Sequence, residues 1–265
     1  MKKTTLTFSL LMALCMVFTS CSKDDDEQPE QENYALGEIP GLGDASGELT
    51  SAPFNLPQGI ELLDEIEGFD FTSEYWNFTG GSASLNVQTK RAPLKNTFVQ
   101  KSVRTKSHET YHYFGSGCNL VDLLIPMTNN NSVATTVNFP AGTILKSRTG
   151  DTQNGVLIKK VSITIPAKTD YYLYLSFYCG NANRDAAGTG DVYDLGVVSN
   201  AHPIIVLCNK VKNKKINIED FSPELSNYMI YTTQAIRLQD IIWSITDGEG
   251  MSEEDISYIN SLPNS

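Results

Sequence analysis

One stretch of alternating side chains limits what this chain can fold into. Residues 171–179 read Tyr-Tyr-Leu-Tyr-Leu-Ser-Phe-Tyr-Cys and lie between two segments rich in turn-forming residues. Successive side chains of a β-strand point to opposite faces, so the stretch predicts a strand with tyrosines on one face and apolar residues on the other. The apolar row ends at Cys179, which we therefore expect to point into the interior.

Shorter segments with strand character precede this stretch. Residues 133–139, 143–145 and 155–165 are separated by turns that contain proline, glycine or aspartate. A hairpin-like pair is also expected within residues 69–87, around two consecutive glycines. Repeated short strands joined by polar turns predict a mainly-β domain, either an immunoglobulin-like β-sandwich or a barrel.

The C-terminal part predicts helices. An apolar run over 203–211 begins with a proline, which is favoured at a first helical position. Ser222, followed by a proline, has the pattern of a helix start, and this helix is expected to end near Thr246, before an Asp-Gly pair. Ser252 precedes three acidic residues and begins a last short helix. We expect a C-terminal α-helical segment over about 203–262, packed on the β domain.

The first 20 residues form a targeting segment. Two lysines precede an apolar run over 6–18, which is too short and wrongly flanked for a membrane span. The run ends at Thr-Ser-Cys21, which resembles the lipobox of bacterial lipoproteins, and the acidic run over 22–27 is similar to the signal that sends Bacteroidetes lipoproteins to the cell surface. This resemblance implies a lipid anchor on Cys21 and an outer-membrane location facing the cell exterior. The alternative is an ordinary signal peptide with a chance cysteine.

Charge and composition limit the domain organisation and the kinds of partner expected for the rest of the chain. Residues 21–50 are acidic and rich in glycine, proline and glutamine, which predicts a flexible tether ahead of a single domain over 51–265. Removal of residues 1–20, which hold two lysines and no acidic residue, changes the formal net charge from −11 to −13. Such an acidic chain is a poor candidate for binding nucleic acid.

A glutamine, Gln239, lies on the apolar side of the helix expected to end near Thr246, and it is the second feature that limits how the chain can pack. A buried amide must find hydrogen-bond partners or cost roughly one to a few kcal/mol, so Gln239 needs a partner. Cys118, Cys179 and Cys208 follow Cys21, and an odd number leaves one thiol outside any disulfide, although the sequence does not choose among the pairings. Gln239 either bonds to the backbone of a neighbouring loop, or meets Cys179 and forms an internal thioester with loss of ammonia.

Two motifs around these residues resemble the signatures of bacterial thioester domains. The stretch 238–243, Leu-Gln-Asp-Ile-Ile-Trp, is similar to the glutamine motif of that family, and Tyr178-Cys179 is similar to its aromatic-cysteine motif. Leu238 and Ile241 stand where the family usually has Thr and Ala, and the separation of the cysteine and the glutamine is shorter than is usual. The resemblance covers about residues 130–248. It implies a surface adhesin that binds its target covalently, with Gln239 as the acyl donor and Cys179 as the acyl acceptor.

Four further residues are expected at this thioester. Phe177 and Trp243 would shield the bond, and Tyr178 and Asp240 would line its mouth. The partner would be a host or bacterial surface protein or a glycan, which the sequence does not identify. The alternative from another class is a non-covalent binding or structural surface module with an ordinary buried cysteine.

A metalloprotease-like pattern gives a third interpretation. His108, Glu109 and His112 match the H-E-x-x-H pattern, in which the histidines bind zinc and the glutamate activates water. The preceding residues 101–107 lack the apolar stripe of a buried active-site helix, and the neighbouring segments have strand character. We interpret the match as chance spacing, keep a zinc peptidase as the weakest alternative, and expect no metal, no cofactor and no enzymatic activity.

Overall fold

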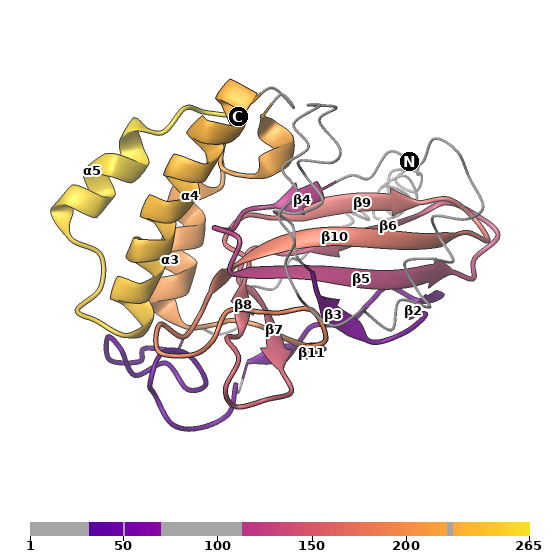
Figure 1. Cartoon of the computed structure of the whole chain (residues 1–265), viewed down its shortest axis with the longest axis horizontal. Coiled ribbons are helices and arrows are strands. Elements are labelled where there is room, and N and C mark those ends of the chain that lie inside the picture. The colour runs from indigo at the N-terminus through magenta and orange to yellow at the C-terminus, as the bar shows by residue number, and fades with distance from the viewer. Residues whose placement is uncertain (1–31, 50, 70–112, 222–224) are drawn as a thin grey trace, which may run out of the picture.

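The computed structural model describes residues 32–49, 51–69, 113–221 and 225–265. The chain is mainly β, with three α-helices among these residues (Figure 1). The strands are β1 (Ala52–Pro53), β2 (Ile60–Leu62), β3 (Ile66–Gly68), β4 (Tyr113–Gly115), β5 (Val121–Asn129), β6 (Thr135–Phe139), β7 (Thr143–Ser147), β8 (Gly155–Val156), β9 (Val161–Ile165), β10 (Asp170–Cys179) and β11 (Val192–Val198). The helices are α3 (His202–Val211), the 3-10 helix η1 (Ile218–Asp220), α4 (Leu225–Thr246) and α5 (Glu253–Ser261).

Six of the strands close into a barrel. The hydrogen-bonded order runs β5, β3, β11, β7, β8 and β10, and β10 then pairs back to β5. Strands β2, β4 and β1 extend this barrel at β5, β10 and β11, while β6 and β9 form a separate antiparallel pair. The barrel alternative for the predicted mainly-β fold is therefore the one that forms.

Strand β10 pairs with β4, β5 and β8, and it is the strand predicted by the alternating residues 171–179. It pairs with β5 along most of its length, from Asp170 opposite Thr128 to Phe177 opposite Val121. Its apolar row points into the barrel core and ends at the buried Cys179, as expected. At the Cys179 end of the strand the opposite face is covered as well, because Tyr178 is completely buried beneath the helices.

The three helices lie together at one end of the long strands β5 and β10 (Figure 1). Apolar residues of α3, α4 and α5 form one buried cluster with residues from the barrel wall, including Tyr178. Helix α3 has its proline in the first turn, α4 ends at Thr246, and the Ser252 side chain caps α5 by accepting the Asp255 N–H. The predicted C-terminal helical segment is thus confirmed, and Ser222, the expected start of its long helix, lies outside the described residues. Among the described residues, no helix is long and apolar enough to cross a membrane.

The prediction of a flexible tether over 21–50 is wrong for residues 32–49. Ile39 and Leu42 are buried in the helical cluster, and the Gly43 N–H donates to the Gly180 carbonyl at 2.7 Å. Gly43 has φ +58°, and a Cβ there would lie 2.0 Å from the Thr246 carbonyl oxygen. The glycines of this segment therefore allow the chain to turn tightly against the end of α4, which composition alone cannot distinguish from flexibility.

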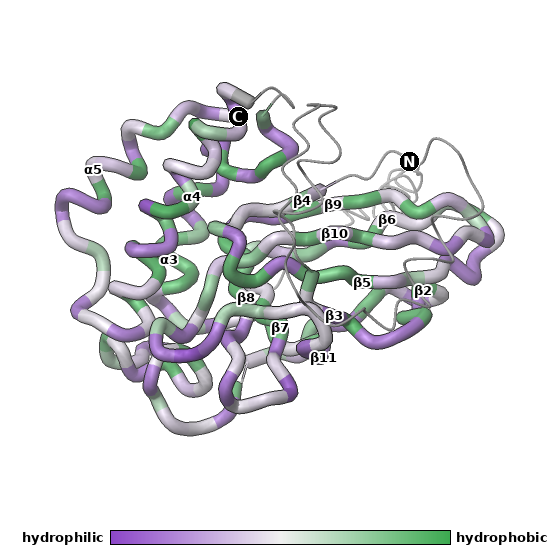
Figure 2. The backbone as a smooth tube through the Cα atoms, in the orientation of Figure 1, coloured by the Kyte–Doolittle hydropathy of each residue, from purple (hydrophilic) through white to green (hydrophobic). Residues whose placement is uncertain are grey.

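Three strands of the barrel, β3, β5 and β11, were not predicted from the sequence. β5 is buried along almost its whole length, so it lacks the alternation of polar and apolar residues that marks a half-exposed strand. β11 begins inside residues 180–196, a stretch of small and polar residues. Figure 2 shows hydrophobic residues along β5 and through α3. Most of the hairpin expected over 69–87 lies outside the described residues.

Candidate functional site

The side chain of Gln239 is buried and fully oriented by one residue of the barrel. Its Oε1 accepts the backbone N–H of Cys179 at 2.8 Å, and its Nε2 donates to the Cys179 carbonyl at 2.9 Å. Helix α4 thus pairs a side-chain amide with the backbone at the last residue of β10. This contact satisfies both ends of the amide, as a buried glutamine requires.

The thiol that contacts Gln239 belongs to Cys118. Its Sγ donates to the same Oε1 at 3.4 Å, across 121 residues of chain. The thiol of Cys179 instead packs among the apolar side chains inside the barrel. The structure therefore brings Gln239 and Cys179 together as expected, but through the Cys179 backbone. The physical reason is the alternation of β10, which directs the Cys179 side chain into the barrel while α4 covers the opposite face at Tyr178.

The loop that carries Cys118 passes close to β10. It joins β4 to β5, and a Cβ added at Gly117 would lie only 2.3 Å from the Phe177 carbonyl oxygen. Asn119 has φ +63°, so the chain turns sharply directly after Cys118. Any side chain at Gly117 would push this loop away from the strand, so the glycine is needed for the position of the thiol.

Both cysteines at this site are protonated at neutral pH. Burial, followed by the negative charge of Asp122, raises the pKa of the Cys118 thiol to about 12, and Asp240 adds to the rise. Burial also raises the pKa of Cys179, as do the nearby Cys118 and Asp122. Cys118, Cys179 and Cys208 are all free thiols, so none of the three disulfide pairings left open by the sequence forms in this structure.

The groups around Gln239 include those that nucleophilic attack on an amide carbon would use. A sulfur that attacks Cδ places negative charge on Oε1, and this atom already accepts the Cys179 N–H. The amide nitrogen is held by the Cys179 carbonyl, which fixes the plane of the group. The geometry therefore combines a thiol, an oriented amide and a hydrogen-bond donor for the oxyanion, as thioester formation needs.

The four residues expected to line the site occupy different places. Asp240 is exposed on α4, and its charge acts on the Cys118 thiol. Tyr178 is buried, and the nearby Cys118 contributes to the raised pKa of its hydroxyl. Phe177 lies inside the barrel, and Trp243 packs against that core. Asp240 and Tyr178 thus lie near Cys118, whereas Phe177 and Trp243 pack with the barrel interior.

Several sequence-based candidates lie outside the described residues. They include Cys21, the expected lipidation site, and His108, Glu109 and His112 of the metalloprotease-like pattern. Within the described residues, no three histidine, cysteine or acidic side chains are grouped as metal ligands.

Cys118 was assigned no role at the thioester by the sequence reasoning, although the chain offered a signal for it. It follows a Gly-Ser-Gly segment that can form a tight loop, and its separation from Gln239 is 121 residues, compared with 60 for Cys179. Comparison of the chain with protein-family models, curated proteins and solved structures found no match in any of the three.

Proposed function

We propose that this protein attaches covalently to a surface partner through an internal thioester between Cys118 and Gln239. The observation that carries the proposal is the 3.4 Å contact between the Cys118 sulfur and the Gln239 side-chain oxygen, with that oxygen also bonded to the Cys179 N–H. Cys118 takes the place that the sequence suggested for Cys179. Cys179 contributes its backbone, which orients the amide and whose N–H donates a hydrogen bond to the oxygen on which negative charge develops.

Thioester formation needs only the Cys118 thiol and the Gln239 amide, with ammonia as the leaving group. The Cys118 sulfur bonds to Cδ of Gln239, the Cδ–Nε2 bond breaks, and the thiol proton leaves with the amide nitrogen as ammonia. An amine or hydroxyl of a partner later attacks the thioester carbon. The acyl group of Gln239 is transferred to it, and the Cys118 thiol is restored.

The cellular setting in this proposal comes from the N-terminal residues. A lipid on Cys21 anchors the protein in the outer membrane, and the domain faces the cell exterior, where it meets a surface protein or a glycan. The similarity of residues 238–243 to the glutamine motif of thioester domains supports an adhesive role. Residues 32–49 pack on the domain, so the proposal needs no flexible tether over those residues.

Intact mass of the mature chain without its lipid tests the thioester. The wild-type protein should weigh one ammonia less than its sequence, and methylamine should add one methylamine to it. Cys118→Ala should have the full sequence mass and take up no methylamine, while Cys179→Ala should keep the wild-type behaviour. A wild-type protein of full mass contradicts the proposal, and loss of the effect only in Cys179→Ala returns the bond to Cys179.

A non-covalent surface module is the second candidate. It is favoured by the complete hydrogen bonding of the Gln239 amide and by the raised pKa of Cys118, which together also describe an unreactive buried contact. The full sequence mass in the wild-type protein would support it. A zinc peptidase that uses His108, Glu109 and His112 ranks third, and metal analysis of the purified chain tests it.

A further inference from the structure

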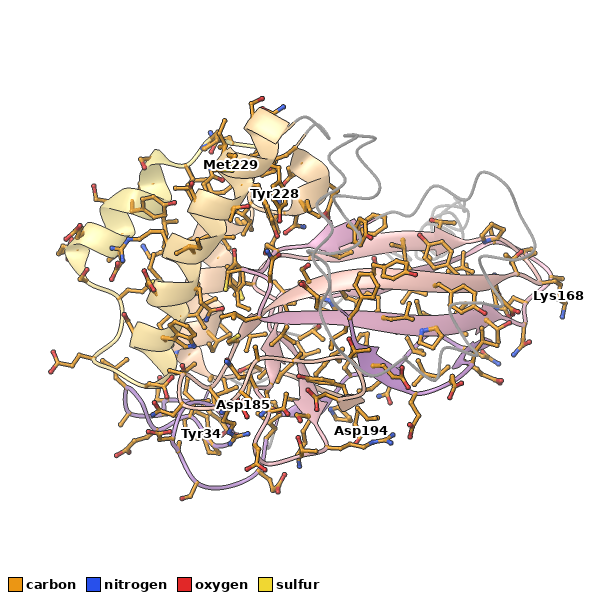
Figure 3. The ribbon with its side chains drawn as sticks, in the orientation of Figure 1. Tyr34, Lys168, Asp185, Asp194, Tyr228 and Met229 are labelled. Carbon is orange, nitrogen blue, oxygen red and sulfur yellow. The ribbon has the colours of Figure 1, made fainter. Side chains whose placement is uncertain are left out.

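Helix α4 forms hydrogen bonds to three consecutive residues of the Cys118 loop, which are residues 117–119. The hydroxyl of Tyr231 bonds to Gly117, Gln239 faces Cys118, and Asn119 donates to the Tyr228 hydroxyl at 3.4 Å. Tyr228 lies near the start of α4 (Figure 3), so the contacts extend along much of the helix. The helix that carries the acyl donor therefore also holds the loop that carries the nucleophile.

The contact between Tyr231 and Gly117 is bidentate. The Tyr231 hydroxyl accepts the Gly117 N–H at 3.1 Å and donates to the Gly117 carbonyl at 2.9 Å. Tyr231 is buried, and its ring packs against Phe221 and Tyr228, with centroid separations of 5.7 and 6.1 Å. One rigidly packed hydroxyl thus fixes both polar groups of the residue directly before Cys118.

The same residue lies close to β10. A Cβ at Gly117 would meet the Phe177 carbonyl oxygen at 2.3 Å, so this position has no space for a side chain. The Tyr231 hydroxyl meanwhile holds the N–H and the carbonyl of Gly117 by hydrogen bonds. Because a glycine has wide backbone freedom, the hydroxyl supplies the restraint that the loop sequence lacks.

We infer that Tyr231 is a positioning residue for thioester formation, an inference that rests on the proposed Cys118–Gln239 bond. Its hydroxyl holds the Gly117 backbone so that the Cys118 sulfur stays beside the Gln239 amide. Displacement of a nucleophile by about 1 Å can slow an oriented reaction about a hundredfold. Tyr231→Phe keeps the aromatic packing and removes only the two hydrogen bonds.

Mass spectrometry of newly purified protein over time tests the role of Tyr231. The rate at which Tyr231→Phe loses ammonia should fall at least about tenfold relative to wild type. The matched control is Tyr171→Phe, because this half-buried tyrosine lies near the start of β10, at the far end of the strand from Cys179. Its rate should match that of wild type. Circular dichroism melts identify the folded fraction. A merely structural effect would lower Tm and leave the rate of thioester formation in the folded protein unchanged.

The outcomes separate this inference from the proposed function. If folded Tyr231→Phe forms the thioester at the wild-type rate, the positioning role is overturned and the thioester itself stands. A wild-type protein of full mass removes the thioester, and alkylation by iodoacetamide then tests whether Tyr231 holds the Cys118 loop in place. In that case Cys118 should react at least about tenfold faster in Tyr231→Phe than in wild type, with Cys208 unchanged. Equal rates at Cys118 would overturn it.

Discussion

The side-chain oxygen of Gln239 lies 3.4 Å from the sulfur of Cys118. Gln239 comes from α4 and Cys118 from the β4–β5 loop. The backbone of Cys179, the last residue of β10, bonds to both ends of the Gln239 amide. This contact places a half-buried thiol beside a buried, oriented amide.

Replacement of Gln239 by glutamate should destabilise the domain. Made in a Cys118→Ala background, in which the Gln239 amide stays intact, the change removes the Nε2 donor to the Cys179 carbonyl and brings a carboxylate to a buried position, which we expect to cost about 2–4 kcal/mol of unfolding free energy at pH 7. Urea unfolding measures the change. Gln58→Glu alters an exposed glutamine and should change stability by less than about 0.5 kcal/mol, so a similar loss in both variants would contradict the prediction.

The reactivity of Cys118 should depend steeply on pH. Because its pKa is raised to about 12, the thiolate is scarce at neutral pH, and alkylation of Cys118 in Gln239→Ala should rise about tenfold per unit between pH 7 and pH 10. A plateau below pH 9 would contradict the raised pKa.

Removal of a nearby negative charge should make Cys118 more reactive. The Asp240 carboxylate contributes to the raised pKa of Cys118, after burial and Asp122, so Asp240→Asn should lower that pKa and speed alkylation about two- to fivefold at pH 8. Iodoacetamide kinetics in the Gln239→Ala background measure this. Glu61→Gln removes an exposed charge on β2 and should leave the rate unchanged.

An alanine at position 117 should disrupt the loop. The new Cβ would approach the Phe177 carbonyl oxygen to 2.3 Å, and we expect a loss of about 2–4 kcal/mol in unfolding free energy together with failure to lose ammonia. Gly150→Ala is the matched control, because no atom lies within 4 Å of a Cβ there. Equal stability of the two variants in urea would show that the loop accommodates the methyl group.

The packing of residues 32–49 can be tested with two leucines. Leu42 is completely buried in the helical cluster, so Leu42→Ala should cost about 2–4 kcal/mol in urea unfolding. Leu36 is 50% exposed in the same segment, and Leu36→Ala should cost less than about 1 kcal/mol. A small effect of Leu42→Ala would support the flexible tether that composition predicted.

Much of the fold was predicted from local sequence. The alternation of residues 171–179 predicted β10 and the direction of its side chains, and Ser252 predicted the start of α5. Residues 32–49 and β5 were misjudged or missed, because their structure follows from burial by other segments. Of the proposed thioester pair, Gln239 was predicted correctly as a buried side chain that needs partners, whereas Cys118 was not recognised.

The sequence by itself determined the mainly-β class, the helical C-terminal segment and the burial of Gln239, because each depends on periodicity and capping within one short stretch. Only the tertiary structure decided which thiol faces that glutamine. Strand alternation directs Cys179 into the barrel, and a glycine loop held between Phe177 and Tyr231 brings Cys118 to the amide. The contact joins segments 121 residues apart, and such proximity is set by packing, which no local pattern records.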